Sequence, residues 1–197
     1  EFAKEMDEFD AHYDDADPAK RLPNYMVMTL PEDHTHGTRI GAVSPRACAG
    51  SNDLGLGLIV ERVSHSKYWA ETAIFVIEDD AQNGSDHVDA HRTIGQCISA
   101  YTRRGTVDST LYSTVSMLRT IELLLGLQPM SQYDAAATPM FAALGDTPDL
   151  TPFTHVEPKI DINEHNGIKA PGAKVSKKMD FSAPDRAPML ELNEVIW

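Results

Sequence analysis

Apolar and polar residues are distributed along the chain in blocks that predict helices and strands. Residues 2–13 carry apolar side chains at helical spacing, with acidic residues over most of the remaining surface. The apolar positions are Phe2, Met6, Phe9 and Tyr13. This spacing predicts an amphipathic helix. The next apolar run, NYMVMTL at 24–30, has the length and composition of a buried strand and is followed at once by a polar loop, PEDHTHGT.

The middle of the chain predicts a helix and a second strand. Apolar positions recur at helical spacing between residues 52 and 65, with Asn52 or Ser51 as a plausible N-cap. The run AIFVI at 73–77 then predicts a buried strand, and several acidic residues follow it directly.

The pattern from residue 92 onward predicts another strand and two helices. The segment 92–101 is a candidate strand, 113–127 predicts a strong helix with Gly126 near its C-terminus, and 131–145 predicts a further short helix. Strands that alternate with helices in this order are typical of an α/β protein. We therefore expect a largely parallel sheet with flanking helices.

The last part of the chain has a different character. Residues 146–197 are rich in proline and charge at first and show no clear period there. We expect an extended surface arm that wraps the domain formed by residues 1–145.

Composition sets broad limits on function. The chain has 197 residues, 42% of them hydrophobic, which is ordinary for a globular protein. Its formal net charge of −13 argues against nucleic-acid binding and, unless cations intervene, against binding to anionic membranes. Two cysteines exclude a disulfide scaffold and a cysteine zinc site. No apolar run reaches the roughly 18 residues that a membrane span needs.

Acidic and histidine residues gather just after two of the predicted strands. Ligands of α/β proteins bind beyond the carboxyl ends of strands, and carboxylates and imidazoles are ligands of divalent metals such as zinc, manganese, calcium and magnesium. The first group is Asp33, His34 and His36, and the second is Asp79, Asp80, His87 and His91. If the two loops converge, they form one metal site whose cations offset the repulsion between carboxylates.

Simpler interpretations remain open for these residues. Asp79 and Asp80 could cap the turn that follows the strand, and the histidines could be solvated loop residues. His87 and His91 have the spacing of the zinc pair in H-E-x-x-H metalloproteases. However, Val88 replaces the glutamate that acts as general base, which disfavours a protease.

The order of these motifs resembles that of a known family. The segments EDDAQNGSDHVDAHR and SMLRTIELLLGLQPMSQYDAAATPM, together with LPEDHTHGT, resemble the phosphoesterase branch of the alkaline phosphatase superfamily. The likeness is strongest to bacterial proteins that carry such a domain behind a YncE-like (YVTN) β-propeller, and it spans nearly the whole chain. It implies an alkaline phosphatase-like α/β fold, a periplasmic or extracellular location and a small phosphate ester as substrate.

The resemblance also implies a role for individual residues. Asp33 and His34 match a middle metal-binding loop, Asp79 and Asp80 a paired acidic ligand, and His87 the last histidine. His36 and His91 are alternates. The nucleophile of the family precedes these motifs, and residues 1–23 contain no serine or threonine. Thr35 and Thr38 lie nearby, but the family pattern supports neither.

We therefore expect residues 1–145 to be the C-terminal part of a catalytic domain whose nucleophile lies upstream of Glu1, so that this chain alone is a poor catalyst. The expected function is metal-dependent hydrolysis of phosphoric esters, of the phosphatase, phosphodiesterase or phospholipase C type. The alternative is a non-catalytic metal- or ligand-binding domain derived from such an enzyme.

Overall fold

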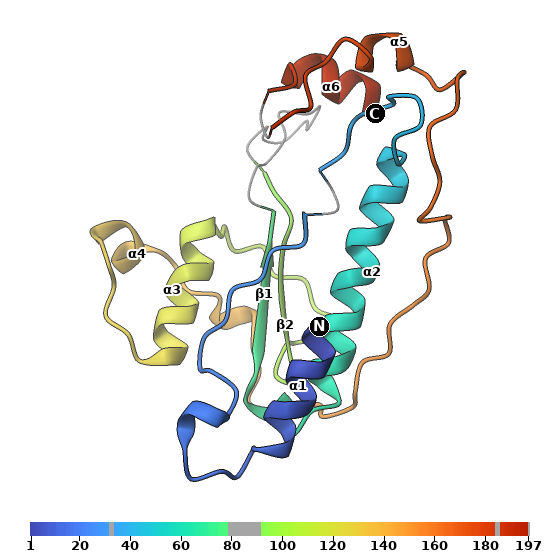
Figure 1. Cartoon of the computed structure of the whole chain (residues 1–197). Coiled ribbons are helices and arrows are strands. Elements are labelled where there is room, and N and C mark those ends of the chain that lie inside the picture. The colour runs from blue at the N-terminus through green and yellow to red at the C-terminus, as the bar shows by residue number, and fades with distance from the viewer. Residues whose placement is uncertain (32–33, 79–91, 184–185, 197) are drawn as a thin grey trace. The chain divides into compact units, whose positions relative to one another are not determined.

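The computed structural model describes residues 1–31, 34–78, 92–183 and 186–196, which divide into two compact units (Figure 1). The first unit comprises residues 1–26, 60–78 and 93–153, and the second comprises Arg92 and the described residues within 27–59 and 154–197. The helix α2 (Pro45–Ser64) contributes residues to both.

The described residues of the first unit form two strands, which run in opposite directions (Figure 1). β1 (Ala73–Ile77) pairs with β2 (Gly95–Ser99), with Ala73 opposite Ser99 and Ile77 opposite Gly95. The expectation of a largely parallel, alkaline phosphatase-like sheet is therefore wrong. A parallel pair needs a crossover that carries the chain back to the start of the first strand. Here the chain re-enters the sheet where β1 ends.

The predicted strand at 24–30 is also absent. These residues have no assigned helix or strand, and no described strand pairs with them. Tyr25 and Val27 are 57% and 75% exposed. An apolar run becomes a strand only where a neighbour satisfies its backbone hydrogen bonds. The sequence shows the run but not the neighbour.

The helix α1 (Phe2–Ala11) confirms the predicted amphipathic helix, and Met6 on its apolar face is 1% exposed. Hydrogen bonds also hold this helix. The Arg62 guanidinium donates hydrogen bonds to Asp7 (2.7 Å) and Asp10 (2.8 Å), and the Tyr68 hydroxyl donates to the Phe9 carbonyl (3.2 Å). A short 3₁₀ turn, η1 (Pro18–Lys20), follows α1, and η3 (Trp69–Glu71) precedes β1.

Two helices follow β2 in the first unit. α3 (Thr114–Leu125) confirms the strong predicted helix: Ser113 caps its first turn, and Gly126 ends it in the left-handed conformation, with φ of 68°. α4 (Gln132–Ala136) is shorter than expected and is followed by η4 (Phe141–Ala143). Hydrogen bonds from Ser131, at the start of α4, help hold the pKa of the buried Asp134 carboxyl below its usual range.

In the second unit, α2 begins seven residues before the expected start at Asn52. Ser44 precedes the helix and accepts a hydrogen bond from the backbone N–H of Ala47 at 3.2 Å, and Pro45 takes the first helical position. Serine followed by proline is a favourable helix start because proline has no N–H to leave unpaired. The cap signal was therefore present in the sequence, upstream of the expected one.

The C-terminal residues of the second unit run beside α2 and then form two short helices, α5 (Ala173–Ser176) and α6 (Met189–Ile196) (Figure 1). Glycines let this segment approach closely. A Cβ atom at Gly50 of α2 would lie 2.6 Å from the side chain of Ile160, and one at Gly172 would lie 2.4 Å from that of Val195. A side chain at Gly50 would displace the end of the Ile160 side chain, whereas one at Gly172 would meet Val195 down to its Cβ atom and would be strained by the positive φ of 71°.

Candidate functional site

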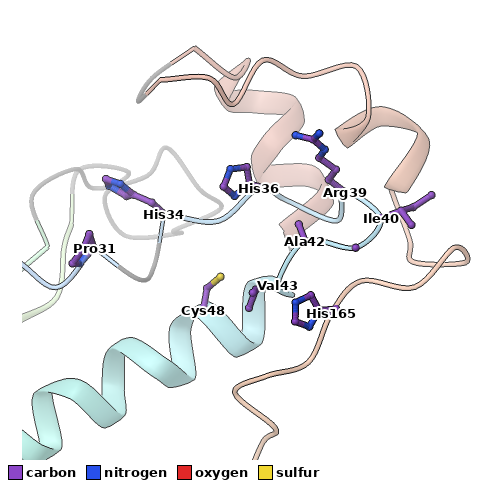
Figure 2. Close-up of a pocket in the computed structure, with 10 residues that line it drawn as sticks. Pro31, His34, His36, Arg39, Ile40, Ala42, Val43, Cys48 and His165 are labelled. Carbon is purple, nitrogen blue, oxygen red and sulfur yellow. The ribbon is translucent and has the colours of Figure 1, made fainter.

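An open pocket of about 650 Å³ lies in the second unit (Figure 2). Its walls come from the loop before α2, from the first turns of α2 and from one residue of the C-terminal segment. The lining residues are Pro31, His34, His36, Arg39, Ile40, Gly41, Ala42, Val43, Cys48 and His165. The pocket thus brings together residues separated by more than 110 positions in the sequence.

His34 and His36 are the two predicted site residues that the structure describes, and both line this pocket (Figure 2). Both side chains are exposed. The backbone N–H of His34 donates to the Pro31 carbonyl at 3.1 Å, and the His36 ring lies 5.2 Å from the ring of Phe181. Both imidazoles are therefore accessible to a ligand in the pocket, and their role as metal ligands stays a prediction.

His165 completes the set of imidazoles, although it comes from the C-terminal segment. An isolated antiparallel bridge pairs it with Val43, which places it at the pocket wall (Figure 2). Its Nδ1 lies 2.7 Å from the carbonyl oxygen of Asn163. Because a carbonyl only accepts hydrogen bonds, Nδ1 must carry the proton, and Nε2 of the neutral ring keeps a free lone pair.

Asn166 holds the loop that forms the pocket wall. Its side-chain amide donates to the carbonyl oxygens of Gly37 at 3.0 Å, Arg39 at 3.1 Å and Val43 at 3.4 Å. Its backbone N–H donates to Ala42, and its carbonyl accepts from Gly41, at 2.8 and 2.9 Å. The residue is 8% exposed. One asparagine thus satisfies backbone groups around the whole turn, which fixes the loop.

A second polar cluster fixes the start of α2. The Arg46 guanidinium donates two hydrogen bonds to the Glu164 carboxylate, and the Ser44 hydroxyl donates a third at 2.6 Å. The backbone N–H of Ser44 also donates to the Glu164 carbonyl at 2.9 Å. The Arg46 guanidinium and then the Ser44 hydroxyl lower the pKa of Glu164 to about 2, because both stabilise its ionised form.

Among the described residues that line the pocket, Arg39 carries the fixed charge. Arg39 lines it and is exposed, while no carboxylate is among the described lining residues. A guanidinium offers a planar fork of donors that matches phosphate oxygens. In the part of the chain that the structure describes, no three histidine, cysteine or acidic residues are grouped closely enough to hold a metal ion.

The two threonines near the pocket are not exposed nucleophiles. Thr38 is 8% exposed, its hydroxyl lies 3.2 Å from that of Ser176, and its backbone N–H donates to the same serine oxygen at 3.0 Å. Among the described residues, the buried Thr35 hydroxyl has no hydrogen-bond partner. In that part of the chain neither threonine hydroxyl bonds to a histidine or carboxylate that could act as its general base, as an activated hydroxyl requires.

The remaining predicted ligands, Asp33, Asp79, Asp80, His87 and His91, lie outside the described residues. The structure adds Arg39 and His165 to the site. His165 has no local signal in the sequence, because its place at the pocket depends on a pairing with Val43.

Comparison of the chain with models of protein families, with curated proteins and with solved structures gives no match. None of the described helices is both long and apolar enough to cross a bilayer.

Proposed function

We propose that the chain belongs to a metal-dependent hydrolase of phosphoric esters and carries part of its site. The observation that carries the proposal is the convergence of His34 and His36 with Arg39 on one open pocket. Imidazoles are ligands for divalent metals, and a guanidinium is suited to phosphate oxygens. The sequence resemblance to phosphoesterases independently selects the same loop.

The guanidinium and the imidazoles would have different roles in this site. Arg39 would bind and orient non-bridging phosphoryl oxygens, while His34, with His36 as alternate, would hold a divalent cation. The described residues offer imidazoles but too few ligands to hold a metal ion. Asp33, Asp79 and Asp80 would supply the carboxylate ligands. The cation would supply Lewis-acid stabilisation of the developing phosphoryl charge.

One observation favours a second candidate function, a non-catalytic domain that binds metal or an anionic ligand. The described lining residues include no serine or threonine, and the one nucleophilic side chain among them, Cys48, is 8% exposed. Such a domain would bind a metal ion or an anion through the same side chains but would not hydrolyse an ester.

Hydrolysis of p-nitrophenyl phosphate and bis-p-nitrophenyl phosphate by the purified chain, with zinc, manganese, calcium or magnesium, separates these candidates. For the hydrolase we expect slow but metal-dependent turnover, because this chain is expected to lack the nucleophile, and Arg39→Gln should lower its kcat/KM at least about tenfold, since a phosphate contact is lost. Arg21→Gln is the matched control, because Arg21 is exposed and belongs to the first unit.

The possible results lead to different conclusions. Metal binding by calorimetry without turnover supports the non-catalytic domain. Absence of both metal binding and turnover contradicts both candidates.

A further inference from the structure

Positive charge is concentrated in two segments of this acidic chain. Residues 34–52 and 165–179 together contain six of the 17 lysine and arginine residues and none of the 30 aspartate and glutamate residues. The rest of the chain therefore carries eleven positive and 30 negative side chains. The net charge of −13 conceals this uneven distribution.

The fold brings these two acid-free segments together in the second unit. Asn166 binds the carbonyls of the 37–43 loop, and Ser176 of α5 binds Thr38. At Gly172 an added Cβ atom would lie 3.2 Å from the Thr38 hydroxyl, so the turn before α5 also lies against this loop. The two segments that carry these basic residues are thereby in contact with each other.

The lysines around α5 face solvent. Ala173 and Ser176 are 6% and 0% exposed and form the buried face of the turn, whereas Lys174, Lys177 and Lys178 are exposed. Residues three and four apart share a helix face. The backbone N–H of Lys178 still donates to the Val175 carbonyl at 2.9 Å, so the turn continues through these lysines.

The helix α6, which packs against α5, carries two exposed glutamates, Glu191 and Glu194, but the described acidic residues that border the 165–179 segment in sequence are engaged by arginines. Glu164 pairs with Arg46, and Asp180 pairs with Arg186. Within the described residues, Arg39 and the lysines at 169, 174, 177 and 178 form no ion pair with a carboxylate. Unpaired cations on a net-acidic protein indicate a surface that meets an anionic partner.

Exposed aliphatic residues accompany the cations. Ile40 follows Arg39 and is 50% exposed, Ile168 precedes Lys169 and is 80% exposed, and Val175 follows Lys174 and is 44% exposed. Aliphatic side chains mixed with lysine are suited to the interface of an anionic bilayer, where the cations meet head groups and the apolar atoms enter the acyl boundary. Nucleic acid would favour aromatic stacking platforms, which this surface lacks among the described residues.

We propose that this basic surface, formed by Arg39, Ile40, Ile168, Lys169, Lys174, Val175, Lys177 and Lys178, binds the face of an anionic phospholipid bilayer. Carboxylates elsewhere in the chain oppose this binding weakly, because screening at physiological salt acts over about 8 Å. The binding does not depend on the proposed hydrolase activity, and it would place the pocket beside the lipid head groups.

Flotation of the purified chain with vesicles tests this proposal. We expect binding to vesicles of phosphatidylcholine and phosphatidylglycerol in equal parts, little binding to phosphatidylcholine alone, and weakening with added salt. Each lysine near such a surface is worth about fivefold in affinity. Replacing Lys169, Lys174, Lys177 and Lys178 together with glutamine should therefore lower affinity at least tenfold.

The chain contains a matched control. The other four lysines, Lys4, Lys20, Lys67 and Lys159, are outside the surface, and changing all four to glutamine alters the net charge equally. This control should bind vesicles like the unchanged chain. A triple change of Ile40, Ile168 and Val175 to serine should weaken binding to the mixed vesicles and leave binding to heparin unaltered.

Three results would overturn the proposal. They are failure to bind the mixed vesicles, equal losses in the two lysine variants, and tighter binding to heparin or single-stranded DNA than to the vesicles.

Discussion

The side-chain amide of Asn166 lies 3.0 Å from the backbone carbonyl oxygen of Gly37 and donates a hydrogen bond to it. The two residues are 129 positions apart, and the same amide reaches two further carbonyls of the loop. The pocket wall is therefore shaped by a side chain from the C-terminal segment.

Replacing Asn166 with alanine should loosen this wall. The change leaves the carbonyls of Gly37, Arg39 and Val43 without their side-chain donor, and an unsatisfied buried polar group costs about 1–3 kcal/mol. We expect a lower free energy of unfolding and faster amide hydrogen exchange within residues 37–43. Asn163→Ala is the control, because that residue is exposed. Equal effects of the two changes would contradict the role of Asn166.

Glu164 should make stability depend on pH in the acid range. Its pKa is lowered from the usual 4.5 to about 2 by Arg46 and Ser44. A carboxyl with a depressed pKa in the folded state stabilises fully above its unfolded pKa, and this contribution is lost as the pH falls towards the folded pKa. We expect urea midpoints to fall between about pH 4.5 and pH 2.

Glu164→Gln should flatten this pH dependence and lower stability at neutral pH, since the ionised partner of Arg46 is removed. Glu194→Gln, in the exposed part of α6, should leave the profile unchanged. If both variants keep the slope of the unchanged chain, another carboxyl is responsible for it.

Gly172 and Gly167 should differ sharply in their tolerance of alanine. Gly172 has φ of 71°, and an added Cβ would lie 2.4 Å from Val195. Gly167 has open space around it and no positive φ. We expect Gly172→Ala to destabilise the fold by about 1–3 kcal/mol and Gly167→Ala to have little effect. Thermal unfolding of the two variants measures this, and indifference at Gly172 would contradict the close packing of α5 and α6.

His34 and His36 should contribute to metal binding. A cation that binds only the folded state stabilises it by about 3 kcal/mol at a hundredfold excess over Kd. We expect one or more of zinc, manganese, calcium and magnesium to raise Tm, chelation to lower it, and the double change of His34 and His36 to alanine to reduce the response. His65→Ala, at a histidine that does not line the pocket, is the control. A metal response that survives the double change would exclude these imidazoles as ligands.

Local patterns predicted the elements that depend on local interactions. The apolar spacing of α1 and the glycine that ends α3 are visible within a few turns of sequence, and both predictions are confirmed. The strand β1 and the candidate strand at 92–101, which contains β2, are both confirmed, but their antiparallel pairing differs from the expected parallel sheet because strand direction depends on where the chain returns. The strand predicted at 24–30 is absent because no described strand pairs with those residues.

The site was predictable only in part. His34 and His36 stood out because they follow an apolar run, and the structure places both at one pocket. Asn166 and His165 reach this pocket through contacts that span more than 120 positions, so no window of sequence identifies them. The acid-free segments, by contrast, are visible in the sequence, although the net charge of −13 conceals them.

The long-range hydrogen bonds of Asn166 set an order of events during synthesis. A ribosome adds about 5–20 residues per second, so the carbonyl of Gly37 waits on the order of 10 s before the amide 129 positions later is made. Until then the nascent loop at 37–43 must satisfy its carbonyls with water. The pocket wall is therefore among the last parts of the second unit to mature, and a premature stop before residue 166 would leave the turn unsupported even though His34, His36 and Arg39 had all been translated.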